Sequence, residues 1–178
     1  MKRRVFFPVL LMVLAVALAA CGTKEKELFP LEELRNEDGG FQYKDIPFGS
    51  SSEEVLSQIP AEFEKMEAED SLAVSYYTKE TLEFYGSSAS LWVNFDDDKL
   101  ESVSVQIDLK DNEEAFQKIL DELTGLYGEA DEVRSGENDM FTSEIYLWGK
   151  DTDSSRLQAD LIQTGSGIGA NVAVFALE

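Results

Sequence analysis

The sequence contains no histidine, and cysteine occurs once among its 178 residues. The lack of histidine excludes catalysis by serine–histidine–aspartate or cysteine–histidine groups, and it excludes histidine-ligated zinc. With one cysteine there is no internal disulfide, so the folded part has to be stabilised by its hydrophobic core alone. No pair of carboxylates suited to glycoside hydrolysis stands apart from the other acidic residues. We therefore expect a protein that is not an enzyme and that binds no cofactor.

Basic residues are also scarce, because 15 lysines and arginines face 36 acidic residues, which gives a net charge of −21 at pH 7. Such a charge opposes binding to nucleic acid and to anionic lipid head groups. It permits a cationic partner or a divalent ion, but it equally describes a hydrated, soluble surface. The charge therefore argues against nucleic acid without naming a partner.

Three stretches resemble ligand sites but lack an essential position. The aspartate-rich stretches at 96–98 and 151–155 have neither the glycine at the sixth position nor the glutamate at the twelfth that an EF-hand requires. The glycine-rich stretch at 165–169 lacks the last spacing of a dinucleotide fingerprint and lies between two expected strands. We expect polar turns and a hairpin loop, with no metal site. Binding of a small ligand or a divalent cation by the acidic loops stays open as an alternative.

The first 20 residues have the three parts of an export signal: a basic start at 2–4, an apolar run at 5–18, and small residues before a cysteine. The apolar run is shorter than the ~20 apolar residues that span a membrane. Leu18-Ala19-Ala20-Cys21 resembles the lipobox of bacterial lipoproteins, which implies cleavage before Cys21 and a diacylglycerol on its thiol. Because two acyl chains anchor stably, we expect a lipid-anchored protein on the extracytoplasmic face of a bacterial cell membrane. The alternative is an ordinary secretory signal that happens to precede a cysteine.

Composition divides the chain into a signal peptide (1–20), a flexible tether (21–40) and a single α+β domain (41–178). The tether is polar and charged apart from one apolar island at 28–34. Fully extended, a tether of this length reaches at most about 65–70 Å, which would hold the domain clear of the lipid head groups. The island docks either on its own domain or on a partner.

Two segments of the domain have helical signals. Serines at 50–52 with glutamates three residues further on form a capping box, and the helix they begin ends before Pro60. The second helix begins at Asp111 or Asn112, carries an apolar stripe at spacings of three and four, and ends at Gly128.

Most other segments alternate apolar with polar residues, which predicts strands at 72–77, 82–85, 91–95, 102–109, 141–148, 156–162 and 171–177. The aspartates at 96–98 are expected to form a hairpin turn. The order helix, strands, helix, strands predicts an α+β fold, in which two helices pack on one face of an antiparallel sheet and the other face is partly exposed.

The predicted exposed face is a candidate binding surface. If the aliphatic side chains pack on the helices, the opposite face carries aromatic side chains among small polar residues, namely Tyr77, Tyr85, Trp92, Tyr146 and Trp148. Such mixtures are typical of protein-binding surfaces. The alternative is that these aromatics form cross-strand pairs on a solvated sheet, or lie beneath the tether and loops.

Local motifs add a resemblance over residues 43–128. The segment 46–49 leads into a capped helix of the form Ser-x-x-Glu-Val, and the second helix ends in Leu-Tyr-Gly at 126–128. These features resemble a group of envelope lipoproteins that is similar to the beta-lactamase inhibitor protein and the small lipoprotein of the outer-membrane assembly machine. The disulfides of the inhibitor have no counterpart here. The resemblance implies helices behind an antiparallel sheet whose exposed face grips a protein, but it does not carry the partner over.

Together these features predict a non-catalytic envelope lipoprotein that binds another envelope protein. The alternatives are a lipoprotein that binds a small ligand or a divalent cation, and a purely structural envelope component.

Overall fold

A computed structural model describes residues 28–67, 72–110, 112–138, 140–150 and 153–177 of the chain. The expected signal peptide, the expected lipidation site Cys21 and the start of the expected tether lie outside these residues. Within them, no helix has the length and apolar character needed to cross a membrane.

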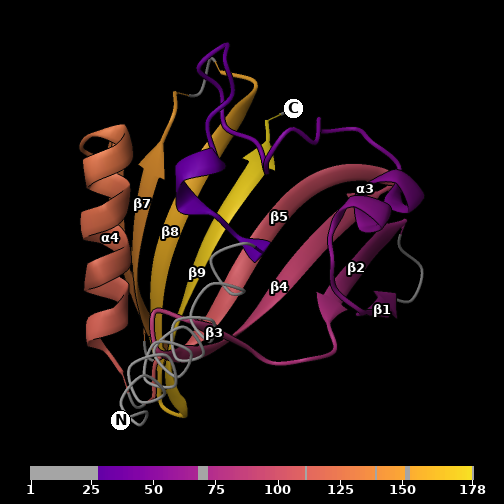
Figure 1. The fold of residues 1–178 in the computed structure, drawn as a ribbon. Coiled ribbons are helices and arrows are strands. Elements are labelled where there is room, and N and C mark those ends of the chain that lie inside the picture. The colour runs from indigo at the N-terminus through magenta and orange to yellow at the C-terminus, as the bar shows by residue number, and fades with distance from the viewer. Residues whose placement is uncertain (1–27, 68–71, 111, 139, 151–152, 178) are drawn as a thin grey trace, which may run out of the picture.

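Nine strands in the described part of the chain form one antiparallel sheet (Figure 1). The strands run along the sheet in the order β1-β2-β4-β5-β9-β8-β7-β6, and β3 pairs with β4. Their bounds are β1 (Phe63–Glu67), β2 (Ala73–Thr78), β3 (Leu82–Phe84), β4 (Ser87–Asp96), β5 (Lys99–Asp108), β6 (Glu132–Glu137), β7 (Phe141–Trp148), β8 (Ser155–Thr164) and β9 (Gly167–Ala176). The sheet thus consists of two antiparallel meanders, and β5 pairs with β9 where they meet.

Helical segments among the described residues include η1 (Leu31–Glu33), α3 (Ser52–Gln58) and α4 (Glu114–Tyr127). The predicted start of α3 is confirmed, because the Ser51 hydroxyl accepts a hydrogen bond from the Glu54 amide at 3.4 Å. The predicted end of α4 is also confirmed: Gly128 has a φ of 85°, and its amide donates to the Thr124 carbonyl oxygen. A positive φ of this kind is typical of glycine at a helix end.

The predicted fold class, α+β with two helices packed on one face, is wrong, because the structure is a β-rich fold. Among the described residues, α3 has only 7 residues and α4 has 14, against nine strands. The short α3 lies where β4 turns into β5, since the backbone of Gly49 and Ser50 is hydrogen-bonded to Leu100. The capping box identified α3 and the apolar stripe identified α4, but neither signal could tell how little of the sheet α3 covers. The predicted start of α4 at Asp111 or Asn112 is wrong, because the helix begins at Glu114 and the residue before it, Glu113, makes no side-chain capping hydrogen bond.

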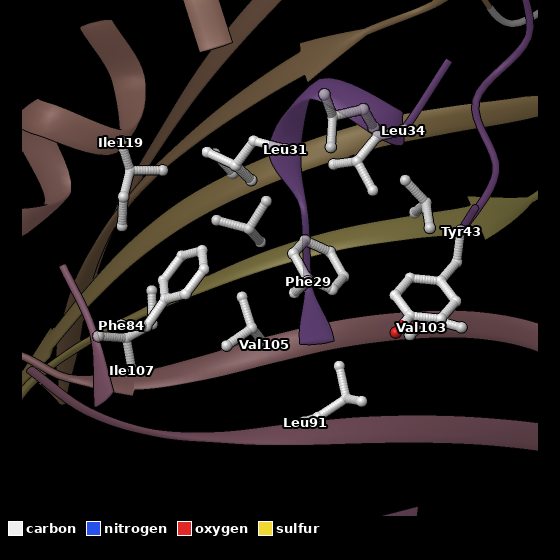
Figure 2. Close-up of a cluster of buried hydrophobic side chains, with 14 of the residues drawn as sticks. Phe29, Leu31, Leu34, Tyr43, Phe84, Leu91, Val103, Val105, Ile107 and Ile119 are labelled. Atoms are coloured by element: carbon white, nitrogen blue, oxygen red, sulfur yellow. The ribbon is translucent and has the colours of Figure 1, made fainter. Parts of the chain in front are cut away.

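Much of the sheet is covered instead by a largely non-helical N-terminal strap, residues 28–46. Its apolar side chains are almost completely buried: Phe29, Leu31, Leu34, Phe41, Tyr43 and Ile46. Figure 2 shows four of them, Phe29, Leu31, Leu34 and Tyr43, together with core residues of the strands. The Phe29 ring stacks on Tyr43 at 5.8 Å and meets the edge of Phe84 at 6.4 Å. The apolar island of the sequence therefore docks on its own domain, and residues 28–40 of the expected tether are part of that domain.

The strap is fixed to α4 as well as to the sheet. The Tyr127 hydroxyl accepts a hydrogen bond from the Leu34 amide at 3.2 Å and donates one to the Leu31 carbonyl oxygen. At the other end of the strap, the Phe41 amide donates to the Ser155 hydroxyl at 2.9 Å. These bonds satisfy backbone groups that would otherwise be buried without partners.

The sheet consequently has two unlike faces. The helix face carries the alternating aliphatic side chains of β4, β5, β8 and β9, which pack against α3, α4 and the strap in one core. We call the opposite side the open face, because the helices and the strap in the described chain all pack on the helix face (Figure 1). The open face carries the other half of each strand, which in β4 is a series of small or polar residues interrupted by Trp92.

A candidate binding face on the sheet

Two of the predicted aromatic residues form a stacked pair on the open face. Tyr77 of β2 and Trp92 of β4 are directly opposite each other in the strand register. Their rings are 5.0 Å apart at an interplanar angle of 25°. Cross-strand aromatic pairs of this kind stabilise a sheet and also present a rigid apolar surface.

Hydrogen bonds fix both rings of this pair. The Tyr77 hydroxyl donates to the Glu64 carboxylate at 2.6 Å, and the Trp92 indole N–H donates to the Ser90 hydroxyl at 2.9 Å. The hydrogen bond to Glu64 raises the pKa of the Tyr77 phenol above its ordinary value. The pair is therefore oriented in advance, which lowers the entropy that a partner would have to remove on binding.

The other three predicted aromatics lie on the helix face, so the expectation of one five-residue aromatic surface is wrong. Trp148 is only 2% exposed, and its indole N–H donates to the Gly128 carbonyl oxygen at 2.8 Å. Tyr146 packs on Phe116 of α4, with ring centroids 6.1 Å apart. Tyr85 lies in the β3–β4 turn and donates its hydroxyl to Glu122 of α4.

The reason for this error lies in β7. Its alternating sets are both apolar at the C-terminal end, with Ile145 and Leu147 on one side and Tyr146 and Trp148 on the other. Alternation alone does not decide which set faces the core when both are apolar. The larger set faces the helix, and Ile145 and Leu147 face the open side.

A polar row crosses the open face on one side of the stacked pair. Ser75 donates to the Asn94 amide oxygen at 2.7 Å, and the Asn94 amide nitrogen donates to the Ser102 hydroxyl at 2.8 Å. The three residues are cross-strand neighbours on β2, β4 and β5. Small polar groups next to rigid aromatics supply adaptable hydrogen bonds at a binding surface.

On the other side of the pair the open face is hollowed into a cleft of about 740 Å³. Its polar lining comes from four strands and includes Ser88, Ser90, Gln106, Asp108, Asp160 and Asn171. Four of these residues, Ser90, Gln106, Asn171 and Asp160, form one continuous cross-strand row. The cleft was not predicted from the sequence, because its residues come from strands that lie far apart along the chain.

Asp160 is the most deeply buried of these polar residues. It is 4% exposed, and its carboxylate accepts hydrogen bonds from Gln158 at 2.8 Å and from Asn171 at 3.1 Å. The Asn171 amide oxygen is buried and has no hydrogen-bond partner among the described residues. Because Asn171 must turn its NH₂ group toward the carboxylate, this oxygen cannot exchange places with the nitrogen.

Two of the three acidic and glycine-rich stretches form the turns that the sequence predicts. Residues 97–98 form the β4–β5 hairpin turn as predicted, and a hydrogen bond from Ser52 lowers the pKa of Asp98. Residues 165–166 form the β8–β9 hairpin turn, also as predicted. The stretch 151–155 lies partly outside the described residues. Within the described ranges, no cluster of three or more acidic, histidine or cysteine side chains could hold a metal ion.

Comparison with known proteins places the chain in a family. A family model described as "Uncharacterised protein" matches residues 43–154, which includes α3, α4 and the strands from β1 to β7. No curated protein and no solved structure matches the chain. The chain belongs to the family of this model.

Proposed function

We propose that the protein is a non-catalytic binding module that a lipid anchor at Cys21 displays on the extracytoplasmic face of a bacterial cell membrane. In this proposal its open face binds another envelope protein. The anchor is supported by the export signal and by the lipobox-like residues 18–21. The binding role is supported by the architecture of the sheet.

The observation that carries the binding role is the Tyr77–Trp92 pair. Tyrosine and tryptophan are the residues that most often dominate binding energy at protein interfaces. Here they are stacked, hydrogen-bonded and partly exposed on the face opposite the helices and the strap. The polar row of Ser75, Asn94 and Ser102 next to them matches the polar surroundings of such aromatic anchors.

The test compares partner capture by three forms of the full-length protein, extracted in detergent with a C-terminal affinity tag. The forms are the natural sequence, the double variant Tyr77→Ala/Trp92→Ala, and Leu126→Ala. Leu126 is 43% exposed on α4, so it controls for loss of an exposed apolar side chain away from the open face. Circular dichroism and thermal unfolding verify that each variant is folded.

We expect the same envelope protein to be retained by the natural sequence and by Leu126→Ala and lost by the double variant. Loss of one central aromatic anchor commonly weakens an interface by at least ~2 kcal/mol, which is about 30-fold. Equal retention by a folded double variant would show that the open face is not the binding surface.

A further inference from the structure

The lining of the open-face cleft has an unbalanced chemistry. It contains the carboxylates of Asp108 and Asp160, the amides of Gln106 and Asn171, and the hydroxyls of Ser88 and Ser90, but no lysine or arginine. A cleft with this lining offers many hydrogen-bond acceptors and two negative charges.

Asp160 is a buried carboxylate that contributes to this excess of acceptors. A carboxylate that is 4% exposed ordinarily has a basic partner, because burying an unpaired charge is costly. In the described part of the chain, its side-chain hydrogen bonds come from the neutral amides of Gln158 and Asn171. The buried Asn171 oxygen beside it also lacks a donor. Both groups would gain from a ligand that brings positive charge and N–H donors into the cleft.

The shape of the cleft admits a long side chain. In the row next to Asp160, Gly169 lies between Asp108 of β5 and Ile162 of β8, so no side chain fills that part of the floor. Ile162, which is 43% exposed and pairs with Gly169, supplies an apolar contact at one side of the cleft. At the other side, Ser90 joins the cleft to the Trp92 ring through its hydrogen bond. A side chain with an aliphatic stem and a cationic head fits this cleft, since the stem can lie on the apolar contacts and the head can face the carboxylates.

We infer that the cleft binds an arginine or lysine side chain of the partner protein, with its cationic head between Asp108 and Asp160. Charge complementarity favours this occupant, since the chain has a net charge of −21 and the lining of the cleft contains no lysine or arginine. This inference rests on the proposed function, because it names the chemistry of the partner at the same face.

The experiment titrates the full-length protein in detergent with three probes: N-acetyl-arginine amide, its neutral analogue N-acetyl-citrulline amide, and spermidine. Calorimetry measures binding, and tryptophan fluorescence reports it independently through Trp92, which is joined to the cleft by Ser90. The variants are Asp108→Asn and Asp160→Asn. Asp96→Asn is the matched control, because Asp96 is an exposed carboxylate at the end of β4 that does not line the cleft.

We expect the arginine amide to bind and the citrulline amide not to bind. Asp108→Asn and Asp160→Asn should each weaken arginine binding by about five-fold or more, the size of one charge interaction near a protein surface. Asp96→Asn should change it by less than about two-fold, because exposed charges outside the cleft are screened. Since Asp160 is buried and its variant could fold poorly, the exposed Asp108 provides the independent test.

Four results would overturn the inference: no binding of arginine amide, equal binding of citrulline and arginine amides, an Asp96→Asn effect as large as that of Asp108→Asn, or tighter binding of spermidine than of arginine amide. The last result would assign the cleft to a free polyamine. The proposed function is tested separately by the aromatic variants. Loss of the partner from Tyr77→Ala/Trp92→Ala without arginine binding would leave that function standing and refute only the inference about the cleft.

Discussion

At the scale of single residues, the two tryptophans have different roles in this sheet, one in the core and one on the surface. Trp148 is buried and satisfies a backbone carbonyl at the end of α4. Trp92 is partly exposed; its indole N–H donates to the Ser90 hydroxyl, and its ring stacks on Tyr77. Replacing Trp148 therefore removes part of the core, whereas replacing Trp92 removes part of a surface. A binding experiment that changes both at once would confuse the two effects.

Tyr85 gives a prediction of pH dependence. Burial, and then its hydrogen bond to Glu122, raise the pKa of the Tyr85 phenol above its ordinary value of 10.0. A raised pKa in the folded state means that this stabilisation is present below pH 10 and is lost as the pH rises toward the folded-state pKa. The natural protein should therefore lose more stability above pH 10 than the variant Tyr85→Phe.

Urea unfolding of both proteins at a series of alkaline pH values measures this difference. All other titrating groups are shared, so they cancel in the comparison. Parallel stability curves for the two proteins above pH 10 would contradict the assigned environment of Tyr85.

At the scale of elements, the strap is the segment whose importance is least visible in the sequence. It contains little regular secondary structure and begins next to a highly charged stretch of sequence. It nevertheless supplies six buried apolar side chains to the core, Phe29, Leu31, Leu34, Phe41, Tyr43 and Ile46. Its contacts reach the sheet, the β3–β4 hairpin and α4. The strap takes the place that a second large helix would fill in an α+β fold.

The strap makes a testable contribution to stability. Phe29 is 1% exposed, so Phe29→Ala should lower the free energy of unfolding by about 3–5 kcal/mol, the usual cost of such a cavity. The matched control is Phe141→Ala at the start of β7, where the ring is 39% exposed and the cost should be below about 1.5 kcal/mol. Denaturant unfolding measures both values. Equal, small losses would contradict the packing of the strap.

The elements also show what the sequence could predict. The hairpin from β4 to β5 was predicted because its apolar residues alternate strictly and its aspartates mark the turn. The edge strands β1 and β6 were missed because both are charged and largely solvent-exposed, which leaves no alternating pattern. The stacked pair was partly predictable from Tyr77 and Trp92, but the cleft depends on the pairing of β5 with β9, which no local pattern reveals.

At the scale of the whole molecule, one connection organises the sheet. The chain leaves β5, passes through α4 to the outer edge at β6, and returns strand by strand until β9 pairs with β5 (Figure 1). Residues 102–108 are therefore paired with residues 169–175, at the opposite end of the sequence. The open-face cleft crosses this junction, so it exists only when both meanders are assembled.

The proposed lipid anchor leads to a prediction about the location of the protein in the cell. Cys21→Ser should abolish lipidation, because serine has no thiol to carry the diacylglycerol. Membrane fractionation should then find the variant no longer held in the membrane by acyl chains, and mass spectrometry should find no lipid on it. Gly22→Ala, which leaves the thiol in place, is the control. A natural protein without a lipid adduct would instead favour the ordinary secretory signal.

The burial of Phe29 also limits the length of the tether between the proposed anchor and the domain. With the strap fastened from Leu28 onward, the chain from Cys21 to Leu28 spans at most about 25 Å, roughly a third of the reach of a tether that ends at residue 40. The domain would stay close to the head groups, and a partner would have to meet it there. A mechanical pull on the anchor would also act directly on the hydrophobic core, because Phe29, the second residue of the strap, is itself part of that core.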